Sequence, residues 1–173
     1  RIESDHSITV VHAFSDADGQ PSAALSLGPD GWLYGCAQNG GPDKLGTVYK
    51  ISPAGDFVVA HTFTNDADQG LGNPVTSLLP DGHGGFYGAA ARDSKSAFGV
   101  IFQWTASGHF EVLAEFQGTR LGRYPTSLAL SPHGVLFGTT FSGPGDNTNG
   151  TIFSLRPGGA LKTLHAFDYN GDG

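Results

Sequence analysis

The sequence predicts an all-β protein built from the blades of a β-propeller. A stretch that reads as two β-strands joined by a tight turn, residues 46–63, recurs at residues 99–116 and 150–167. The leading glycines of these stretches lie 53 and 51 residues apart, and each period holds four strand signals separated by Gly- and Pro-rich turns. Four-stranded sheets that repeat at roughly this spacing are typical of propellers, whose blades pack face to face around an axis.

The first part of the chain predicts one isolated strand and one complete blade. Residues 8–14 (ITVVHAF) resemble the last strand of each blade, so we interpret them as an orphan outer strand that precedes the first blade. The first blade spans residues 21–63, with strands expected at 22–27, 32–37, 47–51 and 57–63. The outer strand of each blade alternates apolar and polar residues, which predicts that it is half buried.

Two further blades follow. The second blade, residues 74–116, is expected to have strands at 75–79, 86–91, 100–104 and 109–116. The third blade, residues 125–167, is expected to have strands at 126–130, 135–140, 151–155 and 160–167, and residues 168–173 then begin a further blade or a linker. Because a closed propeller ring needs about four or more blades, we expect an incomplete ring within this chain.

Composition limits the classes of function. The 173-residue chain has a net charge of −7 with His neutral, which argues against nucleic acid or an anionic membrane as a partner. No apolar run approaches the ~18 residues that would predict a membrane-spanning helix. Cys36 is the single cysteine, so we expect no internal disulfide and interpret it as a small buried residue. The chain starts at Arg1 without a signal peptide, and we expect a processed or partial product.

Long loops and tight turns should lie on opposite faces of the predicted blades. Antiparallel strand order places on one face the loops 15–21, 64–74 and 117–125, together with 38–45, 92–98 and 142–149. The other face receives only short turns that hairpin geometry explains. Because binding residues usually lie on long loops held by a rigid scaffold, we expect binding on the long-loop face.

Several segments of the chain resemble one known family. The segments GTVYKISPAG, HAFSDADGQP, PDGWLYG and SPHGVLFGTT followed by GTIFSLRPGGALKTLHAF are similar to the Gloeo/Verruco (GloVer) tandem repeat family of bacterial surface and secreted proteins. The resemblance covers nearly the whole chain. It implies a propeller-like fold and a secreted, extracellular or cell-surface location, and it implies no activity and no catalytic residues. The second unit departs most from the pattern, and the third lacks the acidic DADG-type loop.

Acidic loops suggest a calcium site. The spacing of Asp16 and Asp18 recurs at Asp66 and Asp68, and the C-terminal DYNGDG offers Asp168, Asn170 and Asp172. Alternating Asp and Asn oxygens followed by Gly resemble the first half of a calcium-binding loop, so one hypothesis is that these loops bind Ca²⁺. The alternative is that these side chains cap turns by accepting backbone N–H groups. No other cofactor is predicted.

A second candidate site lies in the third unit, where basic residues replace the acidic loop. Arg120, Arg123 and Tyr124 would offer guanidinium groups and an aromatic face to an anion or a sugar. The alternative is that the arginines pair with acidic neighbours on the same rim. His12, His61 and His165 share one repeat position on the apolar face of their strands, and we interpret them as packed imidazoles rather than metal ligands.

These patterns lead to three hypotheses of function. The first is a non-catalytic extracellular module for binding, adhesion or assembly, whose partner is a protein or glycan at the long-loop face or other copies of the chain that complete a ring or fibre. The second is an extracellular carbohydrate-active enzyme with carboxylates drawn from Asp16, Asp18, Asp66 or Asp68. The third is a structural subunit joined head to tail into a fibre. We assign no catalytic residues and expect no membrane insertion.

Overall fold

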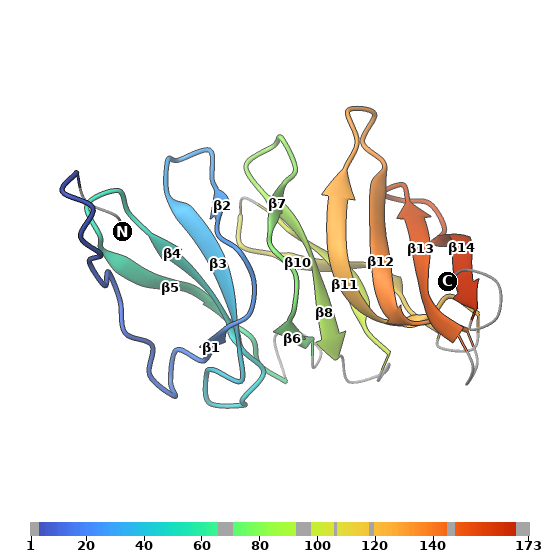
Figure 1. The fold of residues 1–173 in the computed structure, drawn as a ribbon, viewed down its shortest axis with the longest axis horizontal. Coiled ribbons are helices and arrows are strands. Elements are labelled where there is room, and N and C mark those ends of the chain that lie inside the picture. The colour runs from blue at the N-terminus through green and yellow to red at the C-terminus, as the bar shows by residue number, and fades with distance from the viewer. Residues whose placement is uncertain are drawn as a thin grey trace.

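The computed structural model describes residues 4–65, 71–92, 98–105, 107–117, 120–144 and 148–168. Within these ranges the strands pair antiparallel and form three sheets, which we number 1 to 3 in chain order. The sheets stand side by side, and the N- and C-terminal ends lie at opposite ends of the row (Figure 1). The all-β prediction is confirmed. Among these residues no helix is long and apolar enough to cross a membrane.

Each sheet follows the chain from its inner to its outer strand. Sheet 1 has the order β1–β3–β4–β5 with β2 beside β3, sheet 2 the order β6–β8–β9–β10 with β7 beside β8, and sheet 3 the order β11–β12–β13–β14. The strands are β1 Gln20–Pro21, β2 Ser26–Leu27, β3 Leu33–Gln38, β4 Thr47–Ile51, β5 Phe57–Thr62, β6 Gly72–Pro74, β7 Leu79–Pro80, β8 Phe86–Arg92, β9 Val100–Trp104, β10 Phe110–Glu115, β11 Arg123–Leu130, β12 Leu136–Ser142, β13 Thr148–Leu155 and β14 Lys162–Asp168.

The inner strand is broken in sheets 1 and 2, where the sequence alone predicted one strand in each. Hydroxyl groups add hydrogen bonds at the breaks to those of the backbone. Ser22 Oγ donates to the carbonyl oxygen of Cys36 at 3.2 Å and to that of Pro74, in sheet 2, at 2.8 Å. Thr76 Oγ1 accepts the backbone N–H of Ala89 at 2.9 Å. The inner strand of sheet 1 is therefore tied to the next sheet as well as to its own.

The glycines that set the repeat period have a backbone role. Gly46, Gly99 and Gly150 have φ values of 99°, 105° and 120°. Residues other than glycine rarely adopt φ values in this range. A Cβ atom at any of the three would lie less than 3.0 Å from a carbonyl oxygen of the preceding strand. The carbonyl oxygens of Gly46 and Gly99 also accept the N–H groups of Phe63 and Phe116, at 3.0 and 2.9 Å. The regular glycine spacing therefore reflects the path of the backbone into the third strand.

Two hydrophobic cores fill the spaces between neighbouring sheets. The core between sheets 1 and 2 contains Tyr34, Cys36, Val48, Phe63, Leu78, Phe86, Phe102 and Trp104 among its buried residues. The core between sheets 2 and 3 contains Tyr87, Ile101, Phe116, Leu136, Phe153 and Leu155. Burying one such large side chain stabilises the fold by about 1.5–3 kcal/mol. Sheet 2 thus contributes side chains to cores on both of its faces.

The segment 8–14, expected as an orphan outer strand, is not a ladder strand in the structure. Its one strand-like feature is an isolated bridge at Ile8. The segment packs on sheet 1 through side chains instead, because His12 stacks on Phe57 at a centroid distance of 3.5 Å and Phe14 lies 4.9 Å from Tyr49. The physical reason is that the segment joins none of the three described sheets, so no regular ladder fixes its backbone as a strand.

Candidate functional site

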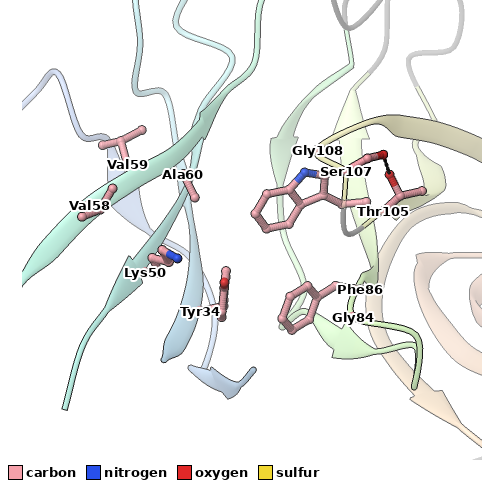
Figure 2. A pocket seen from close by; sticks show the side chains of 11 residues that line it. Tyr34, Lys50, Val58, Val59, Ala60, Gly84, Phe86, Thr105, Ser107 and Gly108 are labelled. Carbon is pink, nitrogen blue, oxygen red and sulfur yellow. Dashed lines mark hydrogen bonds between the residues drawn. The ribbon is translucent and has the colours of Figure 1, made fainter. Parts of the chain in front are cut away.

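A cleft opens between sheets 1 and 2, on the side of the short turns. Its volume is about 420 Å³. Figure 2 shows Tyr34, Lys50 and Ala60 of sheet 1 on one side and Phe86 of sheet 2, with the turn residue Thr105, on the other. Val58, Val59, Gly84, Trp104, Ser107 and Gly108 complete the lining. The hydrophobic core between the two sheets therefore ends in a concave surface.

The cleft is lined by the aromatic residues Phe86, Trp104 and Tyr34, and Phe110 adjoins Trp104 outside the lining. Trp104 of β9 pairs in register with Phe86 of β8 and with Phe110 of β10. The indole ring lies 5.9 Å from Phe86 and 5.7 Å from Phe110, with ring planes only 22° and 11° apart. Tyr34 of β3 approaches from sheet 1, at 4.7 Å from Phe86 and 5.9 Å from Trp104. Four aromatic rings from two sheets thus meet here.

Lys50 and Tyr34 line the same cleft, and Asp30 lies next to both of them. Asp30 Oδ2 accepts the hydroxyl of Tyr34 at 2.9 Å and lies 3.4 Å from Lys50 Nζ. Burial, followed by the nearby Asp30 carboxylate, raises the pKa of Tyr34 to about 12. Burial acts to raise the pKa of Asp30 as well, but hydrogen bonds from Tyr34, Trp32 and Lys50 outweigh it and the pKa is lowered. Lys50 Nζ also lies 4.5 Å above the ring of Trp32.

The indole N–H of Trp104 is a buried donor that finds no acceptor in the described part of the chain. Trp104 is 9% exposed, and no acceptor among the described residues lies within hydrogen-bond distance of its Nε1 atom. Buried polar groups in proteins are nearly always hydrogen-bonded, so each exception calls for a physical explanation. In sheet 3 the same strand position is Leu155, which is 1% exposed and has no polar group to satisfy.

A second, smaller cavity lies among the long loops of sheet 1 and contains Asp16. Its volume is about 300 Å³, and it is lined by Phe14, Ser15, Asp16, Gly19, Gln20, Pro21, Asn39 and Lys44. Asp18 takes part in local bonds instead. Its Oδ2 accepts the backbone N–H of Ser15 at 2.9 Å and the Ser15 hydroxyl at 2.8 Å, and lies 3.3 Å from Nε2 of His12. Asp18 therefore has the turn-capping contacts that the sequence offered as the alternative to calcium binding.

The other residues of the calcium hypothesis are not brought together with this pair. Asp168 ends β14 in sheet 3 and pairs with Thr148, whereas Asp16 and Asp18 belong to the loop before sheet 1. Asp66, Asp68, Asn170 and Asp172 lie outside the described residues. Within the described part of the chain no group of three or more His, Cys, Asp or Glu side chains is arranged to hold a metal ion. Calcium binding stays a prediction.

The basic candidates lie where the chain enters sheet 3. The guanidinium carbon of Arg123 lies 5.9 Å from the ring centroid of Phe98. Tyr124 has a positive φ of 60°, is 42% exposed, and donates its backbone N–H to Phe98 at 2.7 Å. Arg120 is exposed in the preceding turn. The anion or sugar site proposed for these residues stays a prediction.

Two of the three repeated histidines and the cysteine have packing roles, whereas His165 is exposed on β14. His61 lies 4.4 Å from Phe110 and 5.0 Å from Phe63, and His12 stacks on Phe57, which confirms the interpretation of these two imidazoles as packed rings. Cys36 is 1% exposed, and burial raises the pKa of its thiol to about 12. At neutral pH the thiol is therefore protonated and shielded, which disfavours a role as a nucleophile.

Reasoning from the sequence missed the cleft between sheets 1 and 2. It directed attention to the long loops, whereas the cleft lies beside the short turns at residues 81–85 and 105–109. One signal was present in the sequence. Trp104 ends a strand whose counterparts end in Ile51 and Leu155, so an aromatic residue with a donor group replaces two aliphatic ones.

Comparison with known proteins gives a family match and a fold match. The model of the family described as "Gloeobacter/Verrucomicrobia repeat" matches residues 1–173. No curated protein matches the chain in sequence. Among solved structures, a streptogramin B lyase matches with a TM-score of 0.55 and 16% identity, covering 91% of this chain and 43% of the other. A gluconolactonase from Xanthomonas campestris matches with a TM-score of 0.54 and 15% identity, covering 84% and 47%.

The chain thus spans less than half the length of these two solved chains. At such low identity the likeness shows the fold alone, and it confirms the prediction of β-propeller blades.

Proposed function

Because the chain belongs to the Gloeobacter/Verrucomicrobia repeat family, we propose that it works as a binding and assembly module of the β-propeller type rather than as an enzyme. In this proposal the sheets at the two ends of the row pack against sheets of neighbouring copies. The prediction of an extracellular or cell-surface location rests on the family resemblance and is part of the same proposal.

The observation that carries the proposal is a contact that repeats from one unit to the next. His61 and Phe63 at the end of β5 pack on sheet 2, with His61 at 4.4 Å from Phe110 and Phe63 at 4.9 Å from the same ring. His12 and Phe14 pack on sheet 1 in the same way, at 3.5 and 5.5 Å from Phe57. The segment 8–14 therefore occupies on sheet 1 the place that an outer strand occupies on sheet 2.

The outward face of sheet 3 carries residues that are buried elsewhere in the row. Tyr34 and Tyr87 occupy the second position of β3 and β8, and each is 8% exposed because the next sheet covers it. Phe137 occupies that position in β12 and is 38% exposed, and Phe141, four residues later on the same face, is 71% exposed. Exposed apolar patches of this kind commonly mark interaction sites. Because Phe137 occupies the position at which Tyr34 and Tyr87 are covered by the next sheet, we infer that a further sheet of the same type covers this face of sheet 3.

A second copy of the chain is the occupant that we propose. The first sheet of one copy would receive the third sheet of another, and His165 and Phe167 of β14 would take the place of His12 and Phe14. Segment 8–14 would then compete with the incoming copy for the surface formed by Tyr49 and Phe57. A head-to-tail contact of this kind gives a ring if the rotation closes and a fibre if it does not.

Sedimentation velocity on the full chain tests the proposal. We expect self-association that rises with concentration, that increases when residues 1–14 are deleted, and that is lost in Phe137→Lys. Val112→Lys is the matched control, because Val112 is 43% exposed on β10 of the middle sheet. A sharp monomer boundary at all concentrations, for both the wild type and the deletion variant, would contradict lateral assembly.

The hypothesis of a carbohydrate-active enzyme can be tested separately. The activities named for the lyase and the gluconolactonase belong to those proteins. Binding is favoured here because the carboxylate of Asp18 already accepts two hydrogen bonds from Ser15. A turnover screen on polysaccharides, with Asp16→Asn as the comparison, would reverse this preference if the wild type released sugars and the variant did not.

A further inference from the structure

We propose that the cleft between sheets 1 and 2 binds a neutral pyranose unit of a glycan, with Trp104 and Lys50 as the principal contacts. The site lies within one copy of the chain, so the inference goes beyond lateral assembly and does not depend on it. The cleft volume of about 420 Å³ falls in the range of about 300–1,000 Å³ that is common for small-ligand sites.

Tyr34 and Trp104, which are 8% and 9% exposed, supply the aromatic part of the apolar half of such a site, and Phe86 beside them is 2% exposed. Phe86 and Trp104 stand side by side on sheet 2, and Tyr34 faces them from sheet 1. Val58 and Val59 of β5 add an aliphatic surface to the lining. A pyranose ring has faces of C–H groups and an edge of hydroxyl groups, so it can contact aromatic and aliphatic side chains while its hydroxyls reach polar partners.

The indole N–H of Trp104 supplies a donor that packing does not explain. Leu155 fills the same strand position in sheet 3 and is completely enclosed by the core between sheets 2 and 3. An aliphatic residue therefore suffices for sheet packing at this position. Trp104 instead carries a buried Nε1 donor that has no acceptor among the described residues, in the wall of a cleft. The Nε1 atom is enclosed in the structure, so a ligand oxygen in the cleft would accept this hydrogen bond after a side-chain shift exposes the donor.

The polar groups at the cleft favour hydroxyl groups as their partners. Lys50 Nζ can donate hydrogen bonds, and the neighbouring Asp30 carboxylate can accept them. The hydroxyl groups of Thr105 and Ser107, which lie 2.9 Å apart, can donate or accept. A sugar hydroxyl both donates and accepts, so it matches this mixture. A proline-rich peptide offers mainly carbonyl acceptors and matches only the donors. The net charge of −7 disfavours an acidic polysaccharide.

The two tryptophans of the chain make a direct binding assay available. Trp32→Phe leaves Trp104 as the sole tryptophan, and selective excitation of tryptophan makes it the reporter inside the cleft. We would titrate this variant with cellohexaose and mannohexaose, and use tetragalacturonate and decaproline as the charged and the peptide comparators. We expect a saturable change in Trp104 emission with at least one neutral oligosaccharide and a weaker response or none with the comparators.

Two substitutions then assign the contacts. Lys50→Met keeps the aliphatic stem, and we expect it to weaken binding at least tenfold, whereas Lys44→Met in the long-loop cavity leaves binding unchanged. Trp104→Leu copies the residue of sheet 3 and should abolish binding, measured by calorimetry. If Trp104→Leu fails to fold, Lys50→Met on the cleft edge still decides the outcome.

Three results would overturn the proposal. One is the absence of a saturable emission change with both neutral oligosaccharides. Another is tighter binding of tetragalacturonate or decaproline than of either sugar. The last is wild-type affinity in Lys50→Met, because the ligand would then bind elsewhere.

Discussion

The imidazole ring of His12 stacks on the phenyl ring of Phe57, with ring centroids 3.5 Å apart and ring planes 1° from parallel. One unit later, His61 lies 4.4 Å from Phe110, the residue that holds the place of Phe57 in sheet 2. The two His–Phe contacts occupy equivalent positions in sheets 1 and 2. In the first the histidine belongs to a segment outside the sheets, and in the second it belongs to a regular outer strand.

Removing the aromatic contact of the N-terminal segment should destabilise sheet 1. Phe14 lies 4.9 Å from Tyr49 and 5.5 Å from Phe57, so Phe14→Ala exposes both rings. We expect a loss of about 2 kcal/mol in the free energy of unfolding, measured by urea denaturation. Ile8→Ala is the control, because Ile8 is 79% exposed and its removal should change stability by less than about 0.5 kcal/mol. Equal losses in the two variants would contradict the packing role of Phe14.

The glycines that set the repeat period should tolerate alanine poorly. At Gly99 a Cβ atom would collide with the carbonyl oxygen of Ala90 and with the ring of Pro125, in addition to the strain of a positive φ. Gly108 has a similar positive φ of 86° but open space around it. We expect Gly108→Ala to cost about 1 kcal/mol and Gly99→Ala about 1–3 kcal/mol more. Thermal denaturation of the pair separates steric collision from backbone strain, and equal shifts in Tm would argue against the collision.

The thiol of Cys36 should react only when the protein unfolds. Burial raises its pKa to about 12 and shields the sulfur, so almost no thiolate is present or accessible at pH 8. We expect labelling by a disulfide reagent to be slow in native protein and complete within seconds in denaturant. Rapid labelling under native conditions would mean that the core between sheets 1 and 2 opens frequently.

Stability should fall in alkaline solution, partly through Tyr34. Its pKa in the folded protein is raised to about 12, above the value of about 10 expected after unfolding. The folded state therefore holds the phenolic proton more tightly, and this contribution is complete below pH 10 and is lost as the pH rises to 12. We expect Tyr34→Phe to flatten the alkaline decline by up to about 2 kcal/mol, measured by denaturation at pH 8 to 12.

Tyr124→Phe is the matched control for the alkaline decline, because this phenol is 42% exposed. It should leave the decline unchanged. If the stability of Tyr34→Phe and of the wild type fell equally with rising pH, other groups would be responsible for the decline. Tyr49 and Tyr87 are the candidates, since burial also raises their pKa values.

Much of the fold could be predicted from the sequence, because glycine spacing and turn residues act locally. The period set by Gly46, Gly99 and Gly150 follows from backbone conformation at each glycine, and the middle strands follow from continuous apolar runs. The state of residues 8–14 could not be predicted in the same way. An apolar alternating pattern indicates strand preference, but a strand also needs a partner for its backbone groups.

The candidate site was less predictable because it depends on contacts between units. Trp104 and Lys50 are 54 positions apart in the chain, and nothing in either local sequence indicates that they line one cleft. The acidic loop gave a partial answer. Asp16 and Asp18 belong to one motif but differ in the structure. Asp18 accepts a hydrogen bond from Ser15, whereas Asp16 lines a cavity.

The offset between an outer strand and the sheet that it covers has a consequence for how such genes change in length. Each of the first two outer strands packs the phenylalanine at its end, Phe63 or Phe116, on the sheet that follows, so a tandem duplication or deletion of one full period keeps this offset between neighbours. A change in the number of units therefore keeps the order of neighbouring sheets, and the residues that meet at the new junction, such as Trp104 or Leu155, decide how well it packs.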